Sequence, residues 1–249
     1  MGKHVGNRPK PTVGGAGDAA AFREVLRRAG WHDTDVRVLV NEGATAANIR
    51  AGLQWLQERS SEGSFTVFHY SGHVLQANGD PDRDGEARDE FLVPYDARSL
   101  IADRELSNRL RGVRGWLWTD ISGCEAAGFD EGGLSGPRRL FTGSSAEHEK
   151  SYERPDWKMS VYTGLSTEYA VLQNQGDANR DGVVSIHEAF RYAEREAPVM
   201  TARQRKGAQH PYLAGGDGSE WFLRPPAPPP PPPKSSQPRG KTCVAGVCV

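Results

Sequence analysis

Apolar residues recur along this chain with two spacings, one typical of short buried strands and one typical of amphipathic helices. Runs of consecutive apolar residues predict strands at 36–40, 65–68, 116–118 and 139–142. Apolar residues three or four positions apart predict helices at 18–29, 45–60, 103–111, 161–173 and 186–196. Asp18 is expected to cap the first helix and Gly30 to end it. Strands that alternate with helices in this way are typical of a doubly wound α/β fold, a mainly parallel sheet with helices on both faces.

The two ends of the chain depart from this pattern. Nine of the 17 prolines follow Leu223, and the six consecutive ones at Pro228–Pro233 leave polyproline II as the only regular structure available. Residues 225–249 are therefore expected to form a disordered, Pro-rich tail; the alternatives are a ligand for a proline-binding domain or a spacer across a cell envelope. Residues 1–12 hold a single valine and no strand pattern, so they are expected to be irregular. The folded domain is expected at 13–224.

The composition narrows the possible functions without choosing one. The 249 residues carry 31 basic and 32 acidic side chains, so no excess of positive charge is available for binding nucleic acid. No run of apolar residues approaches the roughly 18 that a membrane span needs. Three cysteines are too few for a fold built on disulfides, although Cys243 and Cys248 are close enough in sequence to form a small loop. No signal peptide is visible, and the location stays open: the chain is secreted if its true start lies upstream and cytoplasmic otherwise.

Two reactive side chains follow neighbouring strands of the predicted sheet. His73 comes shortly after the strand at 64–68, and Cys124 comes shortly after the strand at 115–119. In open α/β sheets, ligands bind beyond the carboxyl ends of the strands, where these two residues are expected to meet. A thiol beside an imidazole is the minimal set of groups for covalent acyl transfer. The alternative is that Cys124 is a small buried apolar side chain.

Residues 177–188 have the spacing of an EF-hand calcium loop. A sharp turn at Gly182 and hard oxygen ligands at alternating positions are what a cation with six to eight ligands requires. The ligand positions 1, 3, 5, 7, 9 and 12 are Asp177, Asn179, Asp181, Val183 (through its carbonyl), Ser185 and Glu188. The sequence therefore predicts that Ca²⁺ binds here; the alternative is a surface turn rich in Asp, Asn and Gly. A single loop of this kind favours a structural clamp over a calcium switch.

A second acidic run lies shortly after His73. It contains Asp80, Asp82, Asp84, Asp89 and Glu90, and it starts like an EF-hand but has Phe91 at position 12. One interpretation is a solvated acidic loop. The other is a second metal site, since clustered carboxylates repel one another and a divalent cation relieves that repulsion.

The residues around both reactive side chains resemble those of a known family. The stretch from Phe68 to Asp96 contains Tyr-Ser-Gly-His, an acidic loop, Asp-Glu, an apolar pair and Pro-x-Asp. These motifs, together with CysGluAlaAlaGlyPhe at 124–129, resemble those of the caspase-like cysteine peptidases (peptidase C14), in particular the bacterial metacaspase-like branch. The resemblance spans roughly residues 13–223. It implies a doubly wound α/β fold, protein or peptide substrates, and activation by Ca²⁺ at the second acidic run.

The resemblance also implies roles for particular residues. His73 would be the general base and Cys124 the nucleophile, and the backbone N–H groups of Cys124 and of the residue after His73 would form the oxyanion hole. The cleft would be bordered by residues 144–149, and Arg or Lys would be preferred at P1. The residues expected to contact substrate are Asp120, Ser122 and Ser144.

The chain departs from the family pattern at three places. Val74 stands where the family has Gly, which predicts a distorted oxyanion loop if positive φ is needed there. Asp120 lies four residues before Cys124 instead of two, so either the loop carries two extra residues or Ser122 aligns with the nucleophile. No strand precedes the first helix, which suggests a start further upstream or a degenerate copy.

Two functions therefore remain open. One is a calcium-assisted cysteine endopeptidase, and the other is a pseudopeptidase that serves as a calcium-binding interaction module.

Overall fold

A mainly parallel, four-stranded sheet forms the centre of the molecule in the computed structural model, which describes residues 10, 12–79, 87–130 and 133–223. The strand order is β1-β5-β6-β9. The first three strands run parallel and the last is antiparallel to its neighbour. Their bounds are Phe65–Ser71 (β1), Trp116–Ser122 (β5), Arg139–Gly143 (β6) and Tyr212–Gly215 (β9).

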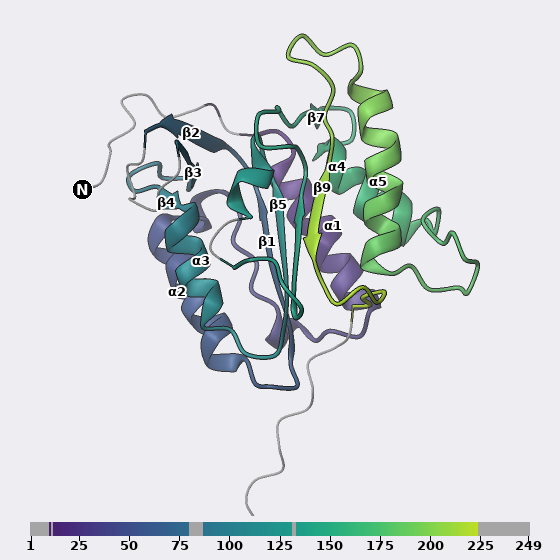
Figure 1. Cartoon of the computed structure of the whole chain (residues 1–249), viewed down its shortest axis with the longest axis horizontal. Coiled ribbons are helices and arrows are strands. Elements are labelled where there is room, and N and C mark those ends of the chain that lie inside the picture. Colours follow the sequence, from purple (N-terminus) through teal and green to yellow (C-terminus); the bar gives the residue numbers. More distant parts are fainter. Residues whose placement is uncertain (1–9, 11, 80–86, 131–132, 224–249) are drawn as a thin grey trace, which may run out of the picture.

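Helices cover both faces of this sheet, as the sequence predicts. The helices α2 and α3 lie on one face, and α1, α4 and α5 lie on the other (Figure 1). The helix α4 continues without a break as a wider π-helical segment, η4. The bounds are Gly15–Arg28 (α1), Ala46–Arg59 (α2), Asp103–Arg111 (α3), Val161–Thr163 (α4), Gly164–Leu172 (η4) and Ile186–Thr201 (α5). The predicted α/β architecture is confirmed.

Alternate side chains of the central strands fill two apolar layers. On β5, Leu117 and Ile121 point towards α2 and α3, while Trp118 points towards α1. Leu117 and Ile121 are completely buried. Each layer is closed by the apolar stripe of an amphipathic helix, such as Leu106 and Leu110 of α3. Burial on both faces explains why these strands are almost continuously apolar in the sequence.

Shorter elements surround the sheet, and the periodicity did not predict them. An antiparallel sheet of three strands follows β1 in the chain, and a two-stranded ribbon precedes α4. The three-stranded sheet consists of Val74–Asn78 (β2), Arg88–Leu92 (β3) and Ile101–Ala102 (β4). The ribbon consists of Glu153–Arg154 (β7) and Met159–Ser160 (β8). Single helical turns lie at Asp33–Asp35 (η1), Asn41–Gly43 (η2) and Ala126–Phe129 (η3).

The beginning of α1 differs from the prediction. The helix starts at Gly15 with Gly14 as its N-cap, so Asp18 lies in the first turn and does not cap it. Its carboxylate instead accepts hydrogen bonds from Ser71 and from the Ser160 N–H, and Asp18 is completely buried. A side chain with these tertiary partners is not available to cap the backbone of its own helix.

The strand expected at 36–40 is not formed. This segment is extended at both ends, with φ near −124° at Val36 and −125° at Val40, but it pairs with no strand in the described part of the chain. Val38, Leu39 and Val40 are consequently 42%, 37% and 40% exposed. The prediction was wrong because an apolar run becomes a strand only when a neighbouring strand supplies hydrogen bonds. As a result β1, not 36–40, is the edge of the central sheet.

The expected domain limits are only partly visible. The segments that the structure describes include most of 13–223, whereas the Pro-rich tail at 225–249 lies outside them. No strand precedes α1 among the described residues Lys10 and 12–14. Within the same described segments, every helix is too short or too polar to cross a lipid bilayer.

The turn that leads into β5 provides a test of the fold. Gly115 has a φ of +74°, and a Cβ added there would lie 2.5 Å from the carbonyl oxygens of Ser61 and Ser64. We expect Gly115→Ala to lower the free energy of unfolding by about 1–3 kcal/mol, because it adds backbone strain to a clash with backbone atoms. Urea denaturation measures this. Gly63→Ala is the matched control, since its Cβ would meet nothing within 4 Å; equal losses in the two variants would contradict the explanation.

Candidate active site

The parallel pairing of β1 with β5 brings His73 and Cys124 to the same edge of the sheet. Ser71 is the register partner of Ser122, and the Gly72 N–H donates to the Ser122 carbonyl at 3.0 Å. His73 and Cys124 each lie two residues beyond this last pair, at the same end of the two strands. Neighbouring strands are about 4.8 Å apart, which is within the reach of an imidazole and a thiol. His73 is exposed and Cys124 is half-buried.

The two side chains are nevertheless turned to other partners. His73 Nε2 lies 2.6 Å from the Lys10 carbonyl oxygen, and the Cys124 thiol donates to the Ser151 carbonyl over 3.8 Å. Burial raises the pKa of the Cys124 thiol, and the negative charges of Glu125 and Glu153 add to this rise. The hydrogen bond to Ser151 and the charge of Lys150 oppose it. The resting cysteine is therefore a protonated thiol without a contact to the imidazole.

The backbone around Cys124 leaves one donor unused. The N–H groups of the neighbouring residues 123 and 125–128 all donate to protein acceptors. Their acceptors are Ser144 Oγ, the Glu149 carbonyl, Ser145 Oγ, the Ser145 carbonyl and the Glu125 carbonyl, in that order. The N–H of Cys124 has no acceptor among the described residues. A single unpaired N–H in a saturated loop is suited to receive an oxyanion.

Val74 does not distort the loop after His73. It begins β2 and does not have a positive φ, so its β-branched side chain introduces no backbone strain. The Val93 N–H donates to the His73 carbonyl, so the next pair in this antiparallel ladder, Val74 with Leu92, is a non-hydrogen-bonded pair. The Val74 N–H therefore points away from β3. Its side chain closes over Gly123, where a Cβ would lie 2.7 Å from Val74 Cγ2.

Asp120 lies inside β5 and belongs to a buried network. One carboxylate oxygen is 2.7 Å from Nδ1 of His69, its register partner on β1. The other oxygen accepts hydrogen bonds from Thr142 and from the Tyr162 hydroxyl. Asp120 is only 2% exposed, so direct contact with substrate does not fit its position. It ties β1, β5, β6 and α4 together beneath the site.

Ser122 and Ser144 are buried as well, at 3% and 0% exposure. Ser122 Oγ is 2.9 Å from Ser160 Oγ, behind the sheet edge. The Ser144 hydroxyl donates to the Gly123 carbonyl at 2.8 Å and accepts from the Gly123 N–H at 2.9 Å. Both side chains support the loop and the sheet edge here, and their contact with substrate stays a prediction. Ser144 fixes the peptide group that precedes Cys124.

Two residues near the site were not predicted to belong to it. Asp18 is buried between Ser71 of β1 and Ser160 of β8. Glu125 contacts Lys150 beside Cys124 and has a φ of +51°, which turns the chain after the nucleophile. The position of Asp18 in the sequence indicates a buried polar contact, because Asp18 lies with Phe22 and Val25 on the apolar face of its helix. An unpaired carboxylate on that face would be costly, so a partner is expected.

The EF-hand-type loop has a defined backbone fold. Arg180 and Gly182 adopt positive φ angles of 62° and 88°. Asp177 accepts hydrogen bonds from the N–H groups of Asp181 and Gly182, and Asp181 accepts from the Val183 N–H. These bonds turn the oxygens at positions 1 and 5 towards the loop backbone, as they are in loops that wrap a cation.

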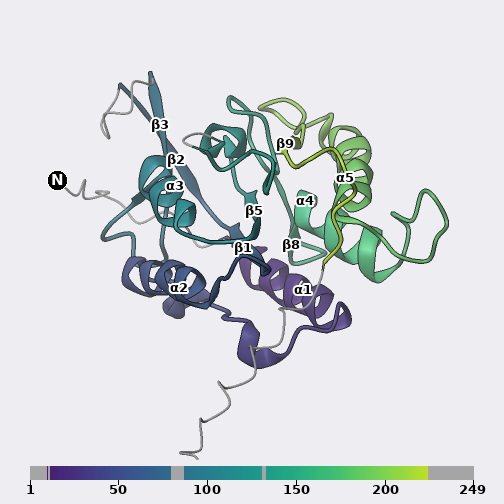
Figure 2. The same ribbon diagram turned by 60° about the horizontal axis from the view of Figure 1, so that its bottom comes forward.

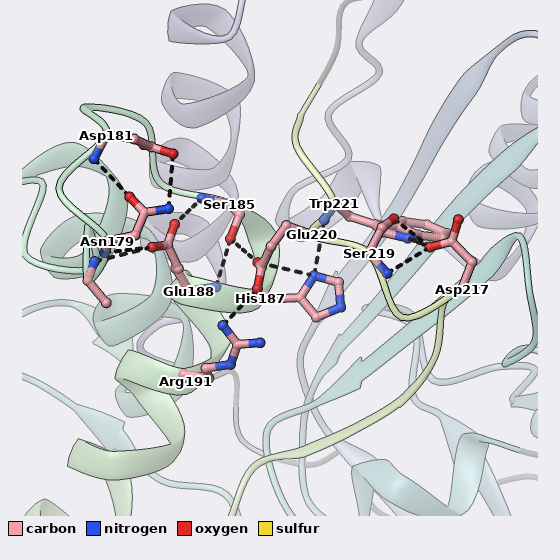
Figure 3. A network of polar contacts seen from close by, with 11 residues as sticks. Asn179, Asp181, Ser185, His187, Glu188, Arg191, Asp217, Ser219, Glu220 and Trp221 are labelled. Carbon is pink, nitrogen blue, oxygen red and sulfur yellow. Dashed lines mark hydrogen bonds and ion pairs between the residues drawn. The ribbon is translucent and has the colours of Figure 1, made fainter.

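The last two ligand positions of this loop are anchored to the protein (Figure 3). Ser185 caps α5 by accepting from the Glu188 N–H, and Glu188 accepts from the Ser185 N–H in return. Glu188 also accepts from the Asn179 N–H at 3.3 Å, and Ser185 donates to Glu220. No three or more His, Cys, Asp or Glu side chains share a metal-binding geometry anywhere in the described residues. In this structure the carboxylates of the loop accept hydrogen bonds from the backbone N–H groups of the loop.

The second acidic run is described only in part. Asp80, Asp82 and Asp84 lie outside the described residues. Asp89 and Glu90 lie in β3 and are 0% and 1% exposed.

Part of the chain is similar in sequence to the metacaspases. Residues 16–115 match the family model described as metacaspase, peptidase C14 domain. This region contains His73 but ends before Cys124. Metacaspase-1 of Mycosarcoma maydis is 30% identical over 97 residues, which is 36% of this chain and 24% of that protein. Metacaspase-1 of Cryptococcus neoformans is 30% identical over 95 residues, 34% of this chain and 20% of that protein. The matched parts thus span about a quarter or less of these relatives.

Solved structures confirm the fold over a larger part of the chain. A crystallised protein of Geobacter sulfurreducens superposes with a TM-score of 0.61 at 13% identity, covering 83% of this chain and 88% of that one. Caspase-1 of Spodoptera frugiperda gives a TM-score of 0.52 at 12% identity, covering 85% and 82%. The architecture described above is therefore caspase-like.

Asp18 makes the stability of the domain depend on pH. Burial raises its pKa above the usual 3.8, so the folded protein retains a proton there that the unfolded chain releases. The contribution of Asp18 to the free energy of unfolding is therefore present at low pH and is lost as pH rises through the raised pKa. Asp18→Asn stays neutral and keeps an acceptor for the Ser160 N–H. We expect the free energy of unfolding of the wild type, measured relative to this variant, to fall as the pH rises above the ordinary carboxyl pKa of 3.8. Urea titrations at several pH values above this pKa measure it, and a constant difference would contradict it.

Proposed function

We propose that the chain is a cysteine endopeptidase in which Cys124 is the nucleophile and His73 the general base. The observation that carries the proposal is the unpaired N–H of Cys124, in a loop whose neighbouring N–H groups are all bonded, at the same end of the sheet as His73, which follows the adjacent strand β1. The match of residues 16–115 to the metacaspase domain supports the same assignment for His73.

The chemistry follows from these groups. His73 takes the proton of the Cys124 thiol, and the thiolate attacks the carbonyl carbon of the scissile peptide bond. The negative charge that develops on the carbonyl oxygen is stabilised by the N–H groups of Cys124 and Val74. The C–N bond then breaks, the imidazolium gives its proton to the leaving amine, and water hydrolyses the thioester. Gly123 stays in place during these steps because Ser144 holds its N–H and its carbonyl.

The resting arrangement must change before the first step. His73 has to leave the Lys10 carbonyl, and the Cys124 thiol has to leave the Ser151 carbonyl. Both are single hydrogen bonds, and His73 is exposed, so a side-chain rotation is sufficient. We propose that substrate binding supplies it.

A basic P1 residue is the second part of the proposal. The side chains of Glu125 and Glu153 place two carboxylates close enough to the Cys124 thiol to act on it, against the single ammonium group of Lys150. Such a site favours a cationic side chain next to the scissile bond. Peptides with Arg at P1 should be cleaved faster than matched peptides with Asp, and a preference for Asp would overturn this part.

Ca²⁺ at residues 177–188 is the third part. The donor set consists of hard oxygens at the EF-hand positions, and Arg180 and Gly182 already adopt the backbone turn. Asp177, Asn179, Asp181, the Val183 carbonyl, Ser185 and Glu188 would hold the ion. Its role there would be to clamp the loop to α5 and to the segment that contains Glu220. For the second acidic run, Ca²⁺ binding stays a prediction, as does a proline-binding or cell-envelope partner for the tail.

The alternative is a pseudopeptidase that keeps the fold as a binding module. The raised pKa of the Cys124 thiol and its lack of contact with His73 favour it. The same structure thus supports an enzyme only if the side chains rearrange.

Replacing the nucleophile separates the two functions. Cys124→Ala is expected to lower cleavage of an Arg-containing peptide by about a thousandfold or more, because no other group can form the thioester. Ser122→Ala is the control, since Ser122 is the competing candidate and is buried against Ser160. Initial rates of peptide hydrolysis measure both. If Ser122→Ala abolishes activity and Cys124→Ala does not, the assignment is wrong; if the folded wild type is no more active than Cys124→Ala, the pseudopeptidase is favoured.

Calcium binding has a test that does not depend on activity. Isothermal titration of the full chain with CaCl₂ should show a binding heat, and Asp177→Ala should weaken the affinity at least about tenfold by removing the ligand at position 1. Glu194→Ala is the matched control, because it removes an exposed carboxylate from α5 outside the loop. Identical titrations for Asp177→Ala and the wild type would show that the loop is not the binding site.

A further inference from the structure

The loop between α5 and β9 projects from the carboxyl end of the central sheet. β9 runs antiparallel to β6, and its first residue, Tyr212, pairs with Gly143 at the end of β6. The loop at 202–211 therefore lies at the same end of the sheet as the candidate active site. It is the uppermost part of the ribbon in Figure 1, and in Figure 2 it lies at the periphery, beside the start of β9.

Hydrogen bonds within this loop and at its base hold it in shape. The Gln204 N–H donates to the Thr201 carbonyl, and the Gly207 N–H donates to the Gln204 carbonyl. The Gln209 N–H closes the loop by donating to Thr201 Oγ1 at 2.8 Å. The Tyr152 hydroxyl donates to the Gly207 carbonyl from outside the loop. Because the loop is already ordered, binding through it costs little conformational entropy.

Two large apolar side chains are exposed where α5 leads into the loop. Val199 is 72% exposed and Met200 is 42% exposed. Val199 is the most exposed large apolar side chain in the described part of the chain. Phe190 and Ala193 of the same helix are buried, so the core already covers the inner face of α5. An exposed apolar pair beside a basic segment is typical of surfaces that contact a protein or a membrane.

Three cationic side chains follow the apolar pair. They are exposed and form no ion pair with any described residue; they are Arg203, Arg205 and Lys206. No acidic residue occurs from position 199 to position 206. Carboxylates on neighbouring elements already have partners, because Glu196 pairs with Arg195 and Glu149 pairs with His210. The loop therefore presents an uncompensated positive charge next to exposed apolar surface.

The end of the α5 helix accounts for only part of this charge. Cations in the last turn of a helix stabilise the negative end of the helix dipole. α5 ends at Thr201 and has no basic residue in its last turn. Arg205 and Lys206 lie four and five residues beyond that end, outside the range of the effect. Their charges are therefore available to a partner.

We propose that residues 199–206, the basic loop, form a docking surface for a lipid bilayer with anionic headgroups. The three cations contact the headgroups, and Val199 and Met200 enter the boundary between headgroups and acyl chains. A loop that projects from the molecule suits a flat surface, whereas a bound peptide usually lies in a groove or along a strand edge. Such a contact is peripheral and needs no membrane-spanning helix. The proposal does not rest on peptidase activity.

Co-sedimentation of the full-length protein with vesicles tests the proposal. One set of vesicles contains phosphatidylcholine alone, and the other is an equimolar mixture of phosphatidylcholine and phosphatidylserine. We expect binding to the mixed vesicles only, and weaker binding as NaCl is raised from about 0.1 M to about 0.5 M, because salt screens the attraction. Absence of binding to the mixed vesicles, or equal binding to both kinds, would overturn the proposal.

Variants show whether the basic loop makes the contact. Each cation near an anionic bilayer strengthens binding about fivefold, so the triple variant Arg203→Gln/Arg205→Gln/Lys206→Gln should bind on the order of a hundredfold more weakly. The matched control is Arg59→Gln/Arg111→Gln/Arg138→Gln, which removes the same charge at the amino end of the parallel strands. This control should bind nearly as the wild type does. Equal losses in the two variants would show that only the overall charge matters, and would overturn the assignment to the loop.

Two further measurements separate a bilayer from an acidic protein as the partner. Val199→Ser/Met200→Ser keeps every charge and should weaken binding to the mixed vesicles about tenfold, because the apolar contact with the bilayer is lost. A blocked octaglutamate peptide, followed by isothermal titration, represents an acidic polypeptide. If this peptide binds through the three cations while the vesicles do not bind, the partner is an acidic polypeptide and the proposal is wrong.

Discussion

The pairing of β1 with β5 is the constraint on which the site depends. One register places Ser71 opposite Ser122 and His69 opposite Asp120, and it brings the loops that carry His73 and Cys124 to the same end of the sheet. A shift of this register by one residue would send every side chain of β1 to the opposite face and would separate each of these pairs. The apolar residues that alternate with them, such as Leu117 and Ile121, stabilise this register because only one register buries them. The core thereby determines where the reactive groups lie.

Polar groups beneath the sheet edge make that constraint more specific. Asp120 binds His69, Thr142 and Tyr162, and Asp18 binds Ser71 and the Ser160 N–H. Loss of one of these hydrogen-bond partners would destabilise the folded state by about 1–3 kcal/mol, because a buried carboxylate would be left partly unsatisfied. Alternative packings of the same strands are therefore disfavoured. The sequence predicts a substrate contact for Asp120 and a helix cap for Asp18, yet in the structure both carboxyl groups hold neighbouring strands and helices in one arrangement.

The sequence predicted what depends on local patterns and missed what depends on distant partners. The helices at Asp103–Arg111 and Ala46–Arg59 were found because apolar periodicity is a local signal. β1 and β5 extend three or more residues further than predicted, since His69 and Asp120 looked like loop residues but satisfy each other across the sheet. The strand predicted at 36–40 is absent although the apolar pattern is that of a strand, because the segment has no strand partner in the described part of the chain. The edge location of His73 and Cys124 was predictable; the orientation of their side chains was not.

That orientation matters less energetically than the backbone arrangement does. His73 and Cys124 are held apart by one hydrogen bond each, to the carbonyls of Lys10 and Ser151. A net hydrogen bond contributes about 0.5–1.5 kcal/mol, and the exposed ring of His73 gives up little apolar burial when it turns. Moving a strand to bring the groups together would instead expose completely buried residues such as Leu117, at a cost of several kcal/mol. The fold therefore already brings the backbones of the two residues to one end of the sheet, which is the energetically larger requirement. The remaining free-energy difference between the resting and the reactive side-chain arrangements is small enough for the binding of a peptide to supply it.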